Sequence, residues 1–169
     1  GKMKAMNGFS GLLRRCIDDY GMIQEGDSIA VGVSGGKDSL VLLCAMRYLQ
    51  TYYPKKFHLE GITLDLGFEG MDFTPVKELC RRWDIPYTVI KTDIKEIVFD
   101  VRKEENPCSL CAKMRRGGLN NAMLERGCNK LALGHHFDDA VETFVMSLFY
   151  EGRISCFKPA TWMSRAGVW

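Results

Sequence analysis

The chain has 169 residues, the length of one domain, and its 46% hydrophobic content excludes a disordered chain. A formal net charge of +2 is too small to indicate a nucleic-acid partner without a local basic cluster, and the dispersed cysteines exclude a secreted disulfide framework. No apolar run approaches the roughly 20 residues that a membrane span needs, and no signal peptide opens the chain. We therefore expect a cytoplasmic protein without a membrane partner.

Hydrophobic patterning predicts short strands that alternate with longer helices. An amphipathic helix is expected first, over residues 8–20. Predicted strands cover 28–33, 57–66, 87–92 and 130–134, and predicted helices cover 37–49, 74–83, a segment that begins near Pro107, and 137–149. This alternation predicts an α/β fold, with an open parallel sheet and helices on both faces. A strand order of 3-2-1-4 would make the first and fourth strands neighbours.

The segment after Gly152 has no predicted regular structure and carries several aromatic residues. We expect residues 1–169 to form a single domain of a longer native chain, because the sequence stops at Trp169 without a polar cap and starts without methionine.

A glycine loop follows the first predicted strand, in the stretch IAVGVSGGKDSL. It differs from the common phosphate loop, which has four residues between its first glycine and Gly-Lys and a hydroxyl residue after the lysine. Here three residues separate Gly32 from Gly36, and Asp38 follows Lys37. The spacing also excludes the dinucleotide fingerprint G-x-G-x-x-G.

The composition of this loop still favours a phosphate ligand. Gly35 and Gly36 let the backbone approach an anion, the hydroxyls of Ser34 and Ser39 can donate hydrogen bonds, and the next helix begins at the ligand. Asp38 is compatible with phosphate when a divalent cation bridges them, which favours a nucleotide with magnesium. The alternative is a glycine-rich turn without a ligand, capped by an aspartate.

A second polar motif, GHHFDD, follows the fourth predicted strand. In the predicted strand order it lies beside the glycine loop, at the switch point where open α/β sheets bind ligands. Helix capping explains one of its carboxylates, Asp138 or Asp139, but the pairing of His135 with Asp139 favours a binding role.

The third motif is a C-x-x-C pair, Cys108 and Cys111, at the expected start of a helix. Such a pair is found in redox sites and as half of zinc or iron–sulfur sites, and an incidental role stays open. The nearby cations and the helix start would favour thiolates. The local basic group could bind RNA phosphates, although a solvated helix face explains it almost as well; it comprises Lys113, Arg115, Arg116, Arg126 and Lys130.

The run SGGKDS at 34–39 resembles the pyrophosphate-binding loop of the PP-loop ATP pyrophosphatases. Together with CSLCAKMRRG and LALGHHFDDAVETFVMSLFYEG, it makes residues 28–152 similar to the TtcA-like tRNA 2-thiocytidine synthetases. The resemblance implies an adenine nucleotide α-hydrolase-like fold. It also implies an ATP-dependent enzyme that adenylates a tRNA cytidine, releases pyrophosphate and inserts sulfur at C2.

The resemblance also implies site residues. The ATP site would comprise Val33, Ser34, Gly35, Gly36, Lys37, Asp38, Ser39, Leu64, Asp65, Gly134, His135 and Asp139. Lys37, Asp38 and Asp139 would be catalytic, the two aspartates through Mg²⁺. Cys108 and Cys111 would ligate a [4Fe-4S] cluster, with a third ligand beyond this chain because Cys156 comes too early. Lys113, Arg115 and Arg116 would bind tRNA. A sulfur donor would be a further partner, and a homodimer is compatible with the sequence.

Two other functions remain open at this point. One is a PP-loop ligase or amidotransferase that acts on another substrate and binds zinc through the C-x-x-C pair. The other is a nucleotide-binding module without catalytic activity, which would bind ATP and release no pyrophosphate.

Overall fold

The computed structural model describes residues 2–34, 37–101, 106–136, 144–150 and 153–157. The helices are α1 (Lys2–Tyr20), α2 (Lys37–Gln50), α3 (Thr74–Arg82), the π-helix η1 (Glu96–Val101) and α4 (Pro107–Glu125). The strands are β1 (Ser28–Gly32), β2 (His58–Asp65), β3 (Tyr87–Lys91), β4 (Lys130–His136), β5 (Phe144–Tyr150) and β6 (Arg153–Phe157). Among these helices, none has the length and apolar character needed to cross a membrane.

The strands form one sheet with the order β3-β2-β1-β4-β5-β6. β1 is central and parallel to both β2 and β4, and Val31 pairs with Gly61 on one side and Ala132 on the other. β3 continues the parallel part beside β2. The predicted α/β class and the predicted order of the first four strands are confirmed.

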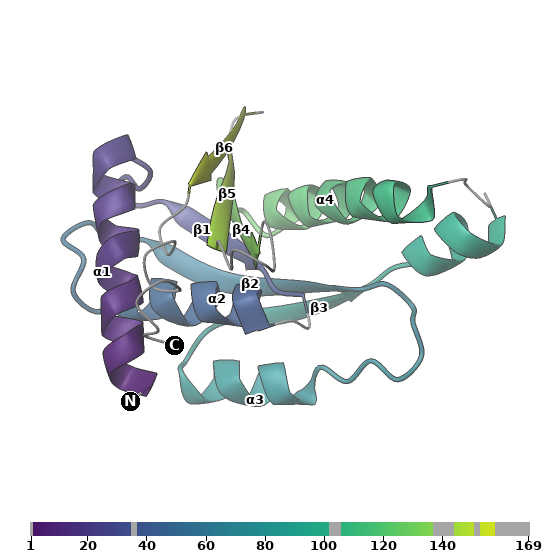
Figure 1. Ribbon diagram of the computed structural model, residues 1–169, viewed down its shortest axis with the longest axis horizontal. Coiled ribbons are helices and arrows are strands. Elements are labelled where there is room, and N and C mark those ends of the chain that lie inside the picture. Colours follow the sequence, from purple (N-terminus) through teal and green to yellow (C-terminus); the bar gives the residue numbers. More distant parts are fainter. Residues whose placement is uncertain (1, 35–36, 102–105, 137–143, 151–152, 158–169) are drawn as a thin grey trace.

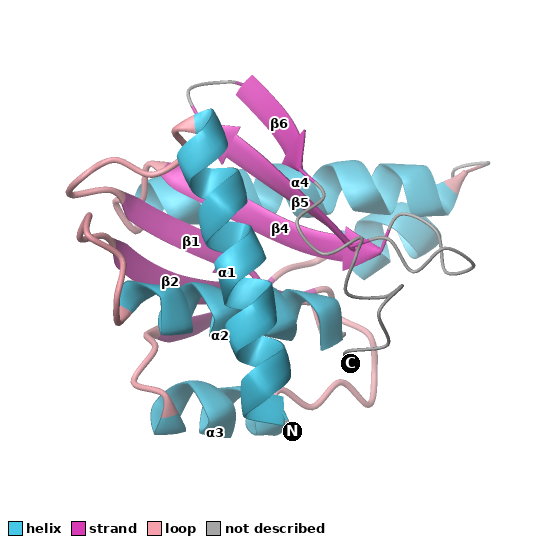
Figure 2. Cartoon of the chain, turned by 60° about the vertical axis from the view of Figure 1, so that its left-hand side comes forward, coloured by secondary structure: helices cyan, strands magenta, loops and turns pink. Residues whose placement is uncertain are grey.

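Helices cover both faces of the sheet, with α2 and α3 on one side and α4 on the other (Figure 1). Figure 2 shows α1 lying across α2 on the first of these sides. Side chains alternate between the two cores as strand geometry requires: Val31 packs with α1 and α2, whereas Ala30 packs with α4. α1 is amphipathic as predicted, and its Phe9, Leu13 and Ile17 are almost completely buried.

The predicted helix over 137–149 is wrong where the structure describes it. Residues 144–150 form β5, which pairs antiparallel with β4, and β6 then pairs with β5 in the segment expected to lack regular structure. Residues 137–143 lie outside the described part. The run FVMSLFY is apolar except for Ser147, and periodicity does not separate a buried strand from a buried helix in such a run. The edge of β4 that faces away from β1 offers backbone hydrogen bonds to residues 144–150, and this pairing favours a strand over a helix there.

Candidate functional site

A cavity of about 660 Å³ opens at the carboxyl ends of β1, β2 and β4. This is the position expected for a ligand in an open α/β sheet. The lining residues come from the strand ends, from the loop after β2 and from α4: Gly32, Val33, Ser34, Thr63, Leu64, Leu66, Met71, Phe73, Ala112, Arg115, Arg116, Leu119, Leu133, Gly134, Ser147 and Phe149.

The floor of the cavity is the end of β1. A Cβ on Gly32 would lie 2.4 Å from Leu133 Cδ2 and 3.0 Å from Leu119 Cδ1, so glycine at this position lets two leucines of the cavity lining pack directly onto the backbone. The next residue, Val33, is fixed by two hydrogen bonds: its N–H donates to the carbonyl of Ile62 at 2.8 Å, and its carbonyl accepts from Thr63 Oγ1 at 2.7 Å. β1 therefore delivers its last residues to the cavity in a defined position.

The glycine loop begins at Ser34, which lines the cavity. Its N–H donates to Ser39 Oγ at 3.0 Å, and the two hydroxyl oxygens lie 3.3 Å apart. Ser39 is 2% exposed, so its hydroxyl closes the loop from the first turn of α2. α2 begins at Lys37, and the amides of its first turn and its dipole favour an anion at this end. Gly35, Gly36 and the side chains of Lys37 and Asp38 lie outside the described part.

Leu64 and Asp65, the two residues expected near adenine, have different roles at the end of β2. Leu64 lines the cavity. Asp65 instead organises the following loop: its Oδ1 accepts the N–H of Gly67 at 3.0 Å, and its carbonyl accepts the N–H and Oγ1 of Thr92, both at 2.9 Å. Asp65 thus acts on the loop that brings Met71 and Phe73 to the cavity.

The end of β4 contributes Gly134 to the lining. His135 pairs with Val145 in the sheet, and its side chain, like Asp138 and Asp139, falls outside the described residues. β5 adds Ser147 and Phe149, which the sequence analysis missed because it predicted a helix there.

α4 forms one wall of the cavity with a stripe of residues at helical spacing, Ala112, Arg115, Arg116 and Leu119. Cys108 and Cys111 lie four residues before Ala112 and Arg115, on the same side of the helix and about one turn closer to its start. The helix start is capped, since Asn106 Oδ1 accepts the N–H of Ser109 at 3.4 Å. Cys108 is exposed and Cys111 is half-buried, and both lie just outside the residues that line the cavity.

Thiolates are the ligands that zinc and iron–sulfur clusters prefer, so the chemistry of this pair fits a metal group. Within the described ranges, no three His, Cys, Asp or Glu side chains gather into a metal site. Cys108 and Cys111 would therefore supply two ligands, and a complete site requires at least one more.

The basic group expected from the sequence divides into two parts. Lys113 and Arg116 are exposed and Arg115 is half-buried, all on α4 beside the cavity. Arg126 and Lys130 were wrongly included, because they form ion pairs near the opposite edge of the sheet. Arg126 Nε donates to the Glu60 carboxylate, and Lys130 Nζ lies 2.6 Å from Asp27 Oδ2.

Comparison with known families matches residues 10–159 to the PP-loop domain. The chain belongs to the PP-loop family. The matched span contains the whole described cavity wall and the cysteine pair. The glycine loop at 34–39 is the motif that suggested this membership from the sequence.

This PP-loop chain is similar to proteins named tRNA-cytidine(32) 2-sulfurtransferase. The one from Alkalilimnicola ehrlichii is 42% identical over 151 residues, which cover 89% of this chain and 48% of the relative. The one from Citrifermentans bemidjiense is 37% identical over 147 residues, covering 86% and 58%. The chain spans about half the length of the curated relatives it matches. These relatives confirm the resemblance to the tRNA 2-thiocytidine synthetases.

Two solved structures share the fold. The U34-tRNA thiolase NcsA from Methanococcus maripaludis, solved with its [4Fe-4S] cluster, has a TM-score of 0.65 and 28% identity, over 81% of this chain and 47% of that one. The NH3-dependent NAD synthetase from Campylobacter jejuni has a TM-score of 0.50 and 17% identity, over 79% and 55%, and shows the fold alone. The fold therefore serves more than one reaction, and the side chains of the site must distinguish them.

Proposed function

We propose that this chain is the ATP-binding part of an enzyme that thiolates a cytidine of tRNA at C2. The observation that carries the proposal is the α4 wall, on which Cys108 and Cys111 continue the same stripe as Arg115 and Arg116. The cysteine pair thus lies about one helical turn from the wall of the cavity in which a nucleotide would react. The names of the sulfurtransferase relatives support the same substrate class.

ATP fits the cavity in size and in chemistry. A volume of about 660 Å³ is within the usual range for small-molecule sites, roughly 300–1,000 Å³. The β and γ phosphates would lie at the glycine loop, near Ser34, Lys37 and the start of α2, where backbone amides favour anions. The adenosine would contact Leu64 and Gly134. Asp38 and Asp139 are the proposed Mg²⁺ ligands, because unbridged carboxylates would repel the phosphates.

The reaction would take place in two displacements. The C2 oxygen of cytidine attacks the α-phosphorus of ATP, a new O–P bond forms, and the bond to pyrophosphate breaks. A sulfur nucleophile from a separate donor then attacks C2, the C–S bond forms, and AMP leaves with the former C2 oxygen. Lys37 and the α2 amides would stabilise the charge of the departing pyrophosphate.

Cys108 and Cys111 are the proposed ligands of an iron–sulfur cluster, with a third ligand from outside this chain. A four-iron cluster with three protein ligands leaves one iron open to hold a sulfur atom for transfer. The NAD synthetase likeness gives no support to a rival function, because it extends to the fold alone.

The decisive experiment combines the full-length native protein, anaerobically reconstituted, with unmodified tRNA, ATP, magnesium and sulfide. We expect pyrophosphate and AMP to form only with RNA present, and mass spectrometry of the nucleosides should detect 2-thiocytidine. ATP binding without RNA-dependent pyrophosphate release would contradict the proposal and favour a binding module.

The cavity cations give a second test. Replacing both Arg115 and Arg116 with Gln should weaken tRNA binding and lower the slope of log affinity against log salt by about two, one for each lost phosphate contact. The matched control is Arg81→Gln with Arg82→Gln, an adjacent and exposed pair on α3. Equal changes in both double variants would show that the α4 arginines have no special role.

A further inference from the structure

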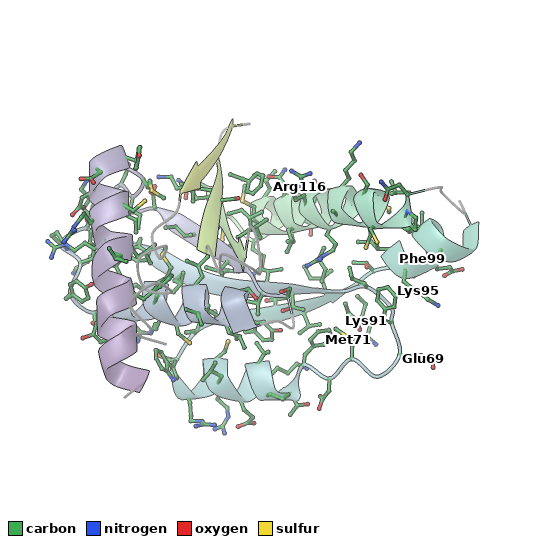
Figure 3. All side chains as sticks on the ribbon, in the orientation of Figure 1. Glu69, Met71, Lys91, Lys95, Phe99 and Arg116 are labelled. Carbon is green, nitrogen blue, oxygen red and sulfur yellow. The ribbon has the colours of Figure 1, made fainter. Side chains whose placement is uncertain are left out.

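An exposed aromatic patch adjoins the cavity, and the ATP site does not account for it. The patch comprises Phe68, Met71 and Phe99, whose exposed fractions are 39%, 49% and 39%. Phe68 and Met71 lie on the loop after β2, and Phe99 lies on η1. Figure 3 shows Met71 and Phe99 at the same edge of the molecule, together with Lys91 and Lys95. Exposed apolar side chains that lie together beside a cavity commonly mark a site of interaction.

The patch is held in a defined shape. The rings of Phe68 and Phe99 meet edge to face, with centroids 6.0 Å apart and planes at 67°. The N–H of Lys95 donates to the carbonyl of Leu66 at 2.9 Å, which ties the start of η1 to the end of β2. Gly67 has a φ of +95°, which favours glycine and turns the chain outward just before Phe68.

The patch is continuous with the cavity. Met71 is both half exposed and part of the cavity lining, and Leu66 and Phe73 on the same loop also line it. A ligand that enters the cavity along this loop would therefore pass over the aromatic rings. Phe68 and Phe99 themselves are outside the lining.

The charges around the patch have both signs. Lys91 is exposed and Lys95 is half-buried, whereas Glu69, Asp72 and Glu96 are exposed acids. This mixture does not match a groove that follows a phosphate backbone, which would be uniformly basic. It matches a surface that holds a flat, uncharged ring, with Lys91 available for a single neighbouring phosphate.

We propose that the aromatic patch stacks an unpaired nucleobase of the RNA substrate, next to the nucleotide whose base enters the cavity. This inference rests on the proposed function. Enzymes that act on a base must take it out of its stack, and neighbouring unpaired bases are commonly held on aromatic side chains. The patch offers such a surface at the entrance, and α4 faces the cavity with Arg115 and Arg116.

The test uses the full-length protein with Phe68→Leu and Phe99→Leu combined, which keeps an apolar surface and removes both rings. The probes are an RNA hairpin with a cytidine in its unpaired loop and a fully paired duplex. We expect hairpin affinity to fall roughly 5- to 100-fold, the usual effect of losing an aromatic stacking partner, and duplex affinity to stay unchanged. ATP affinity should also stay unchanged.

Two further variants control this experiment. Tyr20→Leu removes an aromatic side chain that is 68% exposed at the end of α1, and it should leave hairpin binding unchanged. Phe68→Trp with Phe99→Trp retains stacking surfaces and should restore hairpin binding. Restoration would also show that the leucine variant lost stacking rather than its fold.

Several results would overturn the inference. These are unchanged hairpin affinity in the leucine variant, an equal loss for hairpin and duplex, or protection of Phe68 and Phe99 from hydroxyl-radical labelling in the RNA-free full-length protein. In each case the proposed function survives if wild type still releases pyrophosphate in the presence of tRNA. If wild type fails to do so, the proposed function itself is wrong.

Discussion

The two ends of the parallel strands use polar residues in opposite ways. The carboxyl edge is the side of the sheet where β1, β2 and β4 end, and the amino edge is the side where they begin. At the carboxyl edge, the ends of β1, β2 and β4 surround an open cavity of about 660 Å³. At the amino edge, charged side chains are buried and paired with one another. The first arrangement surrounds a space that a ligand can occupy, whereas the second pairs its charged groups within the protein.

The amino edge is closed by a network around Asp27, which directly precedes β1. One carboxylate oxygen lies 2.6 Å from Lys130 Nζ and accepts the N–H of Gln24 at 2.8 Å. The other accepts from Asn129 Nδ2 at 2.9 Å. Asn129 Oδ1 in turn accepts the N–H of Ser28 at 2.8 Å, so this network joins the starts of β1 and β4.

A second buried carboxylate near this edge is also paired on both oxygens. Glu60 of β2 accepts from Arg126 at the end of α4, and its other oxygen lies 2.8 Å from His58 Nε2. These polar groups connect strands and helices to one another. The comparison indicates that the amino edge stabilises the sheet, whereas the carboxyl edge binds and positions ligands.

Breaking the amino edge should have the largest effect on stability. Lys130→Met keeps the length of the side chain but leaves the Asp27 carboxylate buried without its cation, which should lower the free energy of unfolding by about 3–5 kcal/mol. Urea denaturation measures this loss. ATP affinity should stay unchanged, because Lys130 and Gly134 are four residues apart along β4, roughly 13 Å.

The double variant Asp27→Asn with Lys130→Met serves as the control. It removes both charges, so we expect it to recover part of the lost stability. A loss below about 1 kcal/mol in Lys130→Met would contradict the role assigned to the amino edge.

The same edge should make stability depend on pH in the acid range. Burial pushes the pKa of Asp27 upward, but hydrogen bonds from its neighbours and the charge of Lys130 outweigh burial and leave the pKa below 3.8. Burial likewise opposes a lowered pKa at Glu60, where His58 and Arg126 bring it below 4.5. Both carboxyls therefore have lower pKa values in the folded protein than in the unfolded chain. The stability that their ionised forms contribute is fully present above the unfolded-state pKa values, and it is lost as the pH falls through the folded-state pKa values.

Unfolding in urea from neutral pH down to about pH 2 measures this dependence. Asp27→Asn should flatten the acid slope, because it removes a carboxylate that takes up a proton on unfolding. Glu125→Gln, which neutralises an exposed carboxylate at the end of α4, should leave the slope close to that of wild type. Equal slopes in wild type and Asp27→Asn would assign the acid sensitivity to other groups.

The two edges also differ in how well the sequence predicts them. The glycine loop and the GHHFDD motif are recognisable in the sequence because their residue patterns are unusual and both follow predicted strands. The cation Lys130 was misassigned to a basic surface, because its partner Asp27 lies 103 residues away and sequence pattern carries no information on such pairs. Burial and ion pairing are tertiary properties.

Some residues of the cavity wall could have been predicted from the sequence. Ala112 and Leu119 lie at helical spacing from Arg115 and Arg116, so a helical projection from the predicted arginines would have found them. Ser147 and Phe149 were beyond it, because they reach the cavity through β5, in an apolar run that predicts helix and strand equally well.

A small substitution beside the cavity at the carboxyl edge should change ligand affinity more than stability. Two adjacent glycines of α4 allow a matched test of this expectation. A Cβ on Gly117 would have nothing within 4 Å, whereas a Cβ on Gly118 would lie 2.9 Å from Leu64 Cδ1. Gly117→Ala should therefore stabilise the protein by about 0.5–1 kcal/mol through helix propensity alone. In Gly118→Ala the same gain should be offset, because the Leu64 side chain must leave its preferred position.

Leu64 lines the cavity at the proposed adenine position, so its displacement should reach the ligand. If adenine binds against Leu64 in its original position, ATP binding must force the displaced side chain back, at a cost of about 0.5–1.5 kcal/mol that weakens affinity roughly 2- to 10-fold in Gly118→Ala. Gly117→Ala should bind ATP as wild type does. Thermal unfolding and calorimetry of the two variants measure both quantities. Identical ATP affinities would show that Leu64 forms no part of the ATP site, because the two substitutions differ only in the atom that the new methyl group meets.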